Sequence, residues 1–422
     1  MRPHEETPRW TTELDCRVVS NRPDRSRDSS STNARATRLG FILVVAALLA
    51  ARPVHAADLG DPGDTLSVTI HGFASQGFIL TSGNDYLTVD SKHGSFQFSE
   101  IGINFTKKLT DKLSTGVQFF AQDLGPTGNY DVKADWFYLD YRFEDWFGLR
   151  AGRLKIPYGF YNETYDIDAA RVPVLLPQSV YPLQTREILF AQTGFELYGF
   201  KRIGPLGALD YRLFAGTVFL DAATLTPPGA GYDIRFNVPY VAGGRVIWET
   251  PVEGLRVGGT LEAIHLDTTA YVPDAKKTTL SIEDHSLASL VSAEYARDNF
   301  AVTAEYTRWQ AKQTSADPAN TFSSVSDRGY VMATYRVTPW LQDGIYYSLL
   351  YPDIHNRDGR ENRQHDVAMT MRFDVNRHWL FKVEGHYMEG TAGLTSPLRF
   401  GPPITDAART WGVFLLKTTA YF

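Results

Sequence analysis

Apolar and polar side chains alternate along most of this chain, from near residue 64 to the last residue. Residues 100–105 read Glu-Ile-Gly-Ile-Asn-Phe, and residues 367–373 read Val-Ala-Met-Thr-Met-Arg-Phe. A period of two places successive side chains on opposite faces of a β-strand. Segments of about 10 residues with this pattern, separated by turn residues, are typical of strands that present one face to lipid and the other to a polar interior.

The alternation predicts sixteen strands joined by two kinds of connection. Links of two to four residues, such as 108–111 and 376–377, follow the even-numbered strands, whereas mostly long connections follow the odd-numbered ones. Tight turns at one end and long loops at the other are the layout of an outer-membrane barrel. We therefore predict an all-β fold, a 16-stranded antiparallel transmembrane β-barrel. The expected strands cover residues 64–80, 96–107, 112–123, 132–143, 148–156, 191–202, 207–220, 239–250, 255–267, 282–296, 299–312, 326–338, 340–351, 363–375, 378–389 and 408–422.

Tryptophan placement favours a membrane barrel over a soluble β-sandwich, which shows the same alternation. Some tryptophans flank the expected short turns, and others lie near the long-loop ends of their strands. An indole ring is favoured at a membrane–water interface, so we expect two aromatic girdles. The short-turn group is Trp146, Trp248, Trp340 and Trp379, and the long-loop group is Trp136, Trp309 and Trp411.

The N-terminal region has the features of a secretory signal. Arg35 and Arg38 precede an apolar run of 13 residues (39–51), and the small-x-small pattern that ends at Ala56 predicts cleavage there. The run is shorter than the roughly 20 residues that a membrane-spanning helix needs. A signal followed by a barrel predicts localisation in the bacterial outer membrane. The expected parts are 1–34, a leader extension with a possibly mis-assigned start; 35–56, the signal peptide; 57–63, an N-terminal lead-in; and 64–422, the barrel.

The expected mature chain is acidic and lacks cysteine. Without residues 1–56 it carries 33 Lys and Arg against 42 Asp and Glu, a net charge of −9, and Cys16, the only cysteine, is removed. This excludes disulfides and cysteine-based zinc sites, and the acidity argues against a nucleic-acid partner. No histidine spacing suggests a metal site, so we expect no cofactor and no enzymatic activity. The alternative is a barrel hydrolase that acts on lipid or peptide, because a catalytic triad is defined by geometry rather than by sequence.

The longest connection, residues 157–190, has an unusual composition for a loop. It contains four prolines, six aromatic residues and an apolar stretch at 172–176. Connections of this length are functional or disordered, and this composition argues against disorder. Its aromatic side chains pack the loop or, alternatively, form a sliding surface for sugar rings. Because the barrel interior is the place to bury it, we predict that this third outer loop folds into the lumen and constricts it.

Three stretches in and around this loop resemble a known family. Residues 152–163 read GRLKIPYGFYNE, residues 176–181 read LPQSVY, and residues 185–187 read TRE. They are similar to Gram-negative outer-membrane porins of the phosphate-selective group and related barrels, over roughly residues 148–200. The resemblance implies a 16-stranded, homotrimeric channel for passive diffusion of ions and small polar solutes. The lysine-rich ladder associated with phosphate selectivity is not evident here, which puts phosphate in doubt.

Charged residues in and before this loop are candidates for the pore constriction. Opposed acidic and basic groups across a narrow pore discriminate among ions; alternatively, these charges pair and hold the loop against the wall. Arg153 and Lys155 are expected on the lumen face of their strand, with Leu154 and Ile156 on the lipid face. Because acidic and basic groups are both expected at the constriction, we predict that the channel has modest rather than strict ion selectivity. The candidate residues are Arg153, Lys155, Glu163, Asp166, Asp168, Arg171, Arg186 and Glu187.

The register also assigns other side chains to the two faces of the barrel. Lys382 is expected to face the lumen and to tolerate replacement by Glu. Residues expected to contact lipid or a neighbouring subunit are Val331, Ala333, Tyr335, Met369 and Phe381. Inward charged residues expected to form a hydrated, cross-paired wall are Arg245, Arg256, Glu262, Glu294, Glu305, Arg336, Arg372 and Glu384.

Overall fold

The computed structural model describes residues 57–59, 67–88, 90–125, 128–220, 233–272, 277–316, 318, 321–394 and 407–422. The expected leader extension (1–34) and signal peptide (35–56) lie outside the described residues, as does residue range 60–63 of the lead-in. No helix among the described residues is long and apolar enough to cross a membrane.

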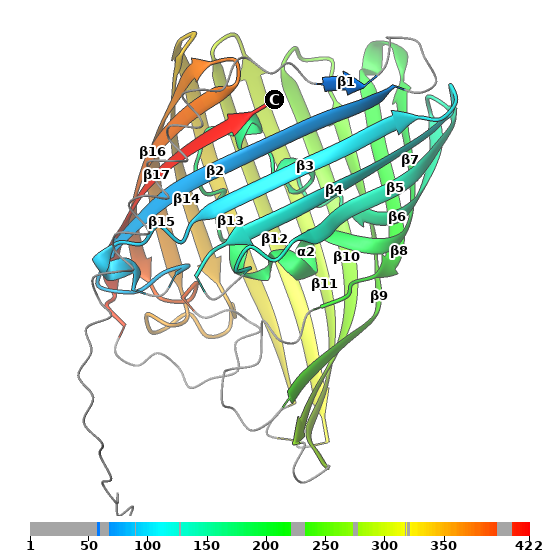
Figure 1. The fold of residues 1–422 in the computed structure, drawn as a ribbon. Coiled ribbons are helices and arrows are strands. Elements are labelled where there is room, and N and C mark those ends of the chain that lie inside the picture. The colour runs from blue at the N-terminus through cyan, green and yellow to red at the C-terminus, as the bar shows by residue number, and fades with distance from the viewer. Residues whose placement is uncertain are drawn as a thin grey trace, which may run out of the picture. The chain divides into compact units, whose positions relative to one another are not determined.

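Sixteen antiparallel strands, β2 to β17, form a closed ring in which each strand pairs with the next (Figure 1). β17 pairs in turn with β2, which places Tyr421 opposite Phe73 and Gly412 opposite Ser82. Closure leaves no free edge among these sixteen strands, so their backbone polar groups are satisfied between neighbouring strands. A three-residue strand, β1 (Ala57–Leu59), pairs with the start of β2.

Each of the sixteen expected strands corresponds to one observed strand, which confirms the predicted fold and strand count. Strands β9 to β13 extend several residues farther into the long loops than the pattern indicated. The bounds are β2 (Val68–Ser82), β3 (Ser99–Lys108), β4 (Leu113–Asp123), β5 (Lys133–Glu144), β6 (Phe147–Lys155), β7 (Ala191–Arg202), β8 (Ala208–Thr217), β9 (Asp233–Glu249), β10 (Leu255–Val272), β11 (Lys277–Arg297), β12 (Phe300–Ser315), β13 (Phe322–Thr338), β14 (Leu341–Tyr351), β15 (Gln364–Asn376), β16 (Trp379–Gly390) and β17 (Thr410–Tyr421).

The short turns have the local conformations that tight hairpins need. Asp298 and Asn299 alone join β11 to β12, and Asp298 adopts φ 54°. Two-residue hairpin loops favour residues that tolerate positive φ, and Asp and Asn are among them. The two short residues therefore connect long strands without splaying them apart.

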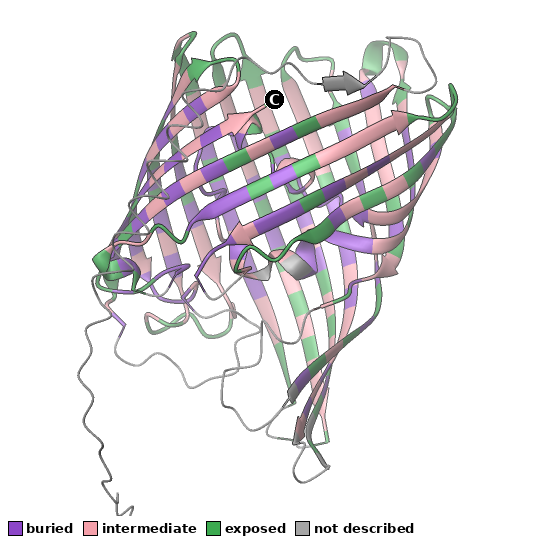
Figure 2. Ribbon diagram, viewed as in Figure 1, coloured by how far each residue is buried: buried purple, intermediate pink, exposed green. Residues whose placement is uncertain are grey.

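Buried and exposed residues alternate along the strands (Figure 2). Lys382 and Glu384 on β16 are fully buried on the inner face, whereas Tyr387, three residues beyond Glu384, is exposed. The predicted register is therefore correct for this part of the wall. The five residues expected on the outer face are exposed or half-buried: Val331, Ala333, Tyr335, Met369 and Phe381.

The tryptophan prediction is correct at the short-turn end only. Trp146, Trp248 and Trp340 are exposed there, and Trp379 is half-buried.

At the long-loop end the predicted tryptophan girdle is wrong. Trp411 is buried and donates from Nε1 to the Gly390 carbonyl (2.9 Å). Trp309 donates to the hydroxyl of Tyr158 in the segment 157–190 (3.1 Å). Trp136 is half-buried with its ring near the Lys155 ammonium. These indoles pack inside the barrel because they share strand faces with inward polar residues.

The expected outward position of Leu154 and Ile156 is also wrong. Both are buried, and Ile156 belongs to the hydrophobic cluster that includes the segment 157–190. Leu154 lies four positions from Arg150, which forms an ion pair with Glu196 inside the barrel, so regular alternation already turns Leu154 inward. The predicted face of this strand was therefore offset by one residue, although Lys155, its last residue, also forms an ion pair inside the barrel.

Candidate functional site

The segment 157–190, between β6 and β7, is a folded unit rather than an open loop. Its ends are joined, because Ile156 N–H donates to the Phe190 carbonyl (2.8 Å). The Asn162 amide donates to the carbonyls of Ile156 and Leu189, at 2.8 Å each. The segment contains four short helical turns: η2 (Asn162–Thr164), η3 (Asp168–Ala170), η4 (Leu183–Thr185) and α2 (Arg186–Leu189).

Most aromatic side chains of the segment serve as packing. Tyr158, Tyr165, Tyr181 and Phe190 are buried in the hydrophobic cluster. This arrangement favours loop packing over the alternative of a sliding surface for sugar rings.

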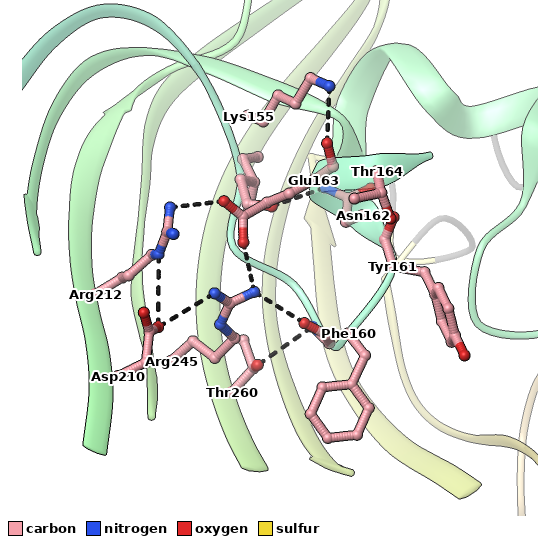
Figure 3. Close-up of polar contacts among 12 residues, drawn as sticks. Lys155, Phe160, Tyr161, Asn162, Glu163, Thr164, Asp210, Arg212, Arg245 and Thr260 are labelled. Carbon is pink, nitrogen blue, oxygen red and sulfur yellow. Dashed lines mark hydrogen bonds and ion pairs between the residues drawn. The ribbon is translucent and has the colours of Figure 1, made fainter. Parts of the chain in front are cut away.

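On the β8–β10 side, one carboxylate of the segment bridges two arginines of the wall (Figure 3). Glu163 contacts Arg212 on β8 (2.6 Å) and Arg245 on β9 (2.7 Å). Asp210 lies behind both guanidinium groups, 3.7 Å from Arg212 and 3.4 Å from Arg245. Burial disfavours ionisation of Glu163, but the two arginines outweigh it and hold the pKa of this carboxyl below its ordinary value.

Backbone groups of the segment reinforce this attachment. Arg245 donates to the Gly159 carbonyl (3.0 Å), and Gly159 N–H donates to the Thr260 hydroxyl on β10 (3.3 Å). Gly159 adopts φ 58°, and an added Cβ would meet the hydroxyl of Tyr181 and the carboxylate of Glu305. A glycine is therefore required where the segment passes close to the wall.

On the β12–β13 side, a buried glutamate of the wall collects donors from the segment. Glu305 accepts from Phe160 N–H (2.9 Å), from the Tyr181 hydroxyl and from the Tyr330 hydroxyl on β13 (2.7 Å). Ser292 on β11 supplies a further donor at 2.5 Å. With several donors, this buried carboxylate fixes the position of the segment.

On the β16–β17 side, the ion pairs are almost completely removed from solvent. The Lys382 ammonium lies 2.9 Å from Asp168 Oδ1 and also donates to the carbonyls of Asp168, Arg171 and Pro173. Lys417 lies 3.6 Å from the same carboxylate, and Thr419 donates to its other oxygen (2.7 Å). Burial opposes ionisation of Asp168, but Lys382 and Lys417 outweigh it and hold its pKa well below the ordinary value.

The structure argues against the expectation that Lys382 tolerates replacement by Glu. Its inward position is as predicted, but its ammonium neutralises Asp168 in a site without solvent. A Glu at this position would bring a second carboxylate against the first, and buried like charges are strongly unfavourable.

The predicted hydrated wall of charges is likewise corrected for several of its members. Glu384 accepts from the backbone N–H groups of Val174 (2.7 Å) and Leu175 (2.9 Å). Arg372 donates to the carbonyls of Ala169 (2.7 Å) and Arg171 (3.1 Å). Together with Arg245 and Glu305, these buried residues bind the segment. By contrast, the cross-strand pairs Arg256–Glu294 (2.8 Å) and Arg336–Asp374 (3.9 Å) agree with the expected wall.

On the β4–β6 side, Lys155 forms an ion pair with Asp166 (2.5 Å), and Gln118 donates to the same carboxylate (2.5 Å). Burial opposes ionisation of Asp166, but Lys155 and these hydrogen bonds hold its pKa below the ordinary value. Arg186 forms a bidentate pair with Asp135 on β5, at 3.0 Å for both bonds. The segment is thus bonded to strands from β4 around to β17.

A cavity of about 200 Å³ lies beside the segment on the β5–β8 side. Four cations and two carboxylates line it together with Trp136 and Tyr138. The charged residues are Arg150, Arg153, Lys155, Glu163, Glu196 and Arg212. The local charge of this cavity is therefore positive, although the whole chain is acidic.

The structure brings the predicted site residues into pairs rather than into one group. Lys155 meets Asp166, and Arg171 lies 3.5 Å from Asp168. Arg153 donates to the Asp135 carbonyl (2.8 Å). The side chain of Glu187 lies outside the described residues.

Several partners of these residues were missed from sequence. Arg150, Asp135, Asp210, Arg212, Glu196 and Lys417 all take part in the network. The alternation along β8 places Asp210 and Arg212 on one face of the strand. This pattern is a signal in the sequence from which their inward position could have been predicted.

The surroundings of His386 bear on the alternative of a hydrolase. His386 is held between Asp366 (3.0 Å) and Glu384 (3.0 Å), and its third neighbour is the Tyr346 hydroxyl rather than a serine. Within the same part of the chain, no group of three or more His, Cys, Asp or Glu is arranged to hold a metal ion.

Solved structures with a similar fold include several outer-membrane proteins. The outer-membrane expressed OmpT of Vibrio cholerae aligns with a TM-score of 0.54 and 13% identity over 87% of this chain and 100% of its own. The anion-selective porin from Comamonas acidovorans gives 0.53 and 12% over 84% of this chain and 99% of its own. The outer membrane channel DcaP of Acinetobacter baumannii gives 0.54 and 11% over 84% of this chain and 97% of its own.

No protein-family model and no curated protein sequence matches the chain. The structural likeness therefore concerns the fold: a closed 16-stranded barrel of the outer-membrane porin type.

Proposed function

We propose that this chain is a porin of the bacterial outer membrane, a water-filled channel for passive diffusion of ions and small polar solutes. The closed barrel with apolar side chains outside and charged side chains inside supports a membrane-spanning channel. The similar solved structures include one described as a porin and one described as a channel. Outer-membrane lipid is then the partner of the outer face.

The observation that carries this proposal is the attachment of the segment 157–190. Charged groups bind it to the wall at Glu163, Asp166 and Asp168, on three different sides of the ring. A segment bonded to strands from β4 around to β17 supports a position across the lumen. It narrows the channel to passages such as the cation-lined cavity beside β5–β8.

The constriction in this proposal is formed by the segment and the wall opposite it. Paired charges set a transverse field, which favours modest rather than strict ion selectivity. The residues assigned to it are Arg153, Lys155, Glu163, Asp166, Asp168, Arg171, Arg186 and Glu187, with Arg150 and Arg212 added on the basis of the cavity.

The proposed assembly is a homotrimer, by resemblance to porins of this size. Chemical crosslinking in native membranes tests it, and a crosslinking pattern that stops at the monomer would contradict it.

Reconstitution of the purified protein into planar bilayers tests the channel itself. Discrete conductance steps are expected. A folded protein that inserts but never conducts, and that cleaves lipid or peptide substrates, would instead favour the hydrolase.

A further inference from the structure

A second cavity, of about 240 Å³, lies where several connections of the long-loop end meet the wall. Tyr86 comes from the connection between β2 and β3, and Glu361 from the connection between β14 and β15. Gln178 belongs to the segment 157–190, and Arg328 points in from β13. The cavity therefore lies at the long-loop mouth of the barrel, on a different part of the wall from the cavity beside β5–β8.

Arg328 differs from the inward arginines that bind the segment. Arg186, Arg212 and Arg245 each have a carboxylate within ion-pair distance. The Arg328 guanidinium instead donates to the Ser326 hydroxyl (2.9 Å) and lies 5.0 Å from the ring centre of Trp309. No carboxylate of the described residues comes within 4.0 Å of it.

Glu361 supplies the opposite charge in the same cavity. Among the described residues no cation, Arg328 included, comes within 4.0 Å of the Glu361 carboxylate. Asp366 also lines the cavity, but its oxygens accept from the Tyr346 hydroxyl (3.1 Å) and face His386 (3.0 Å). One uncompensated cation and one uncompensated anion thus share one cavity without neutralising each other.

We infer that this cavity is a recognition subsite for zwitterionic solutes of the amino-acid class, and this inference rests on the proposed channel function. The solute carboxylate binds Arg328 and its ammonium group binds Glu361. Hydrogen bonds between charged partners are the strong ones. A solute with a single charge leaves one wall group uncompensated, so it binds more weakly.

The remaining lining fits a solute with an aliphatic side chain. Leu87, Leu350 and Pro352 provide apolar contacts, and the side-chain amides of Gln178 and Gln364 lie among the polar lining. A binding site with apolar walls and a few placed polar groups is the usual form of a small-molecule site. The subsite therefore selects solutes where the long-loop mouth meets the segment 157–190.

Saturation-transfer NMR on the full, detergent-solubilised protein tests the inference with three probes of one shape. L-Leucine carries both charges, 4-methylpentanoate lacks the ammonium group, and 3-methylbutylamine lacks the carboxylate. L-Leucine is expected to bind about tenfold more tightly than either analogue, the size of one charged hydrogen bond. If L-leucine binds no more tightly than either one of the two analogues, the inference is overturned.

Charge-neutralising variants make the test specific to the two residues. Arg328→Gln is expected to weaken leucine and 4-methylpentanoate about tenfold while leaving 3-methylbutylamine unchanged. Glu361→Gln is expected to weaken leucine and 3-methylbutylamine while leaving 4-methylpentanoate unchanged. Arg336→Gln, on the same strand as Arg328 but at its short-turn end, is the matched control and leaves all three unchanged. Equal effects of the three variants, or no effect of the first two, would refute the assignment.

Folding and channel function are read separately. Heat-modifiable gel mobility reports whether each variant is folded. Glu361 lies in an exposed connection, so Glu361→Gln still tests the inference if Arg328→Gln does not fold. Planar-bilayer conductance reports the channel. Selective leucine binding without conductance would contradict the proposed function alone, whereas conductance without leucine binding would contradict the subsite alone.

Discussion

Lys382 on β16 and Asp168 in η3 form an ion pair of 2.9 Å in which both side chains are almost fully buried. The two residues lie 214 positions apart in the chain. The pair fastens the middle of the segment 157–190 to the wall. Because desolvated charges interact strongly, each of them depends on the other.

Replacing Lys382 by Met is expected to destabilise the protein by roughly 3–5 kcal/mol, since it leaves Asp168 buried without its main partner. Urea unfolding in lipid vesicles measures the loss. The double variant Lys382→Met with Asp168→Asn removes both charges, so part of the stability is expected to return. A double variant as unstable as the sum of both single changes would show that the pair contributes no coupling.

Neutralising Glu163 is expected to make the channel more anion-selective. Glu163→Gln removes one of the two carboxylates that Arg212 and Arg245 share, the other being Asp210, and makes the charge beside the cavity of the β5–β8 side more positive. Reversal potentials in a KCl gradient measure the shift. Glu253→Gln, in the exposed turn between β9 and β10, is the matched control, since charges beyond a Debye length of about 8 Å are screened.

Acidification is expected to release the segment only at low pH. The pKa values of Asp166 and Asp168 lie below their ordinary value of 3.8, so ionisation of these groups stabilises the attached state. That contribution is fully present above the ordinary pKa and is lost as pH falls through the lowered values. Protease cleavage within residues 157–190 is expected to stay slow from about pH 8 to 5 and to rise below about pH 3. Release near pH 6 would contradict this assignment.

An arginine on the outer face is expected to impair assembly, whereas one on the inner face is not. Met369→Arg and Phe381→Arg place a charge toward lipid, at a cost of about 2–4 kcal/mol near the bilayer midplane. Ser114→Arg lies on the inner face of β4, in line with Gln118, at the short-turn end. Recovery of heat-modifiable protein from membranes is the measurement. Loss of the Ser114 variant with survival of the other two would mean that the faces are reversed.

The strand count and most of the register were predictable because they depend on local periodicity. Side chains on a strand alternate with period two. The residues next to Met369 and Lys382 in the sequence therefore indicate that the first faces outward and the second faces the lumen. At β6 the wrong face was chosen, because Leu154 shares the inner face with Arg150, four positions earlier. Periodicity could not reveal that Lys155, at the end of the strand, also reaches a partner inside the barrel.

The anchors of the segment were not predictable because their partners come from distant strands. No pattern in the sequence relates Asp168 to Lys382, or Glu163 to Arg212. The tryptophans at the long-loop end are a different case. Trp309 lies two positions from Thr307, which is fully buried on the inner face, so the register already implied an inward indole.

The central claim is that the segment 157–190 and the wall beside it form the narrow part of a conducting channel. The most direct test of this claim is whether a thiol reagent that reaches residue 153 blocks the current. Arg153→Cys is introduced into a chain whose native Cys16 is replaced by serine, and single channels are recorded in planar bilayers before and after labelling with a bulky methanethiosulfonate. Lys108→Cys, at an exposed position of the short-turn end, is the control. We expect discrete conductance steps that fall when residue 153 is labelled and stay unchanged when residue 108 is labelled. A folded, inserted protein without conductance steps, or steps that labelling of residue 153 leaves unchanged, would contradict it.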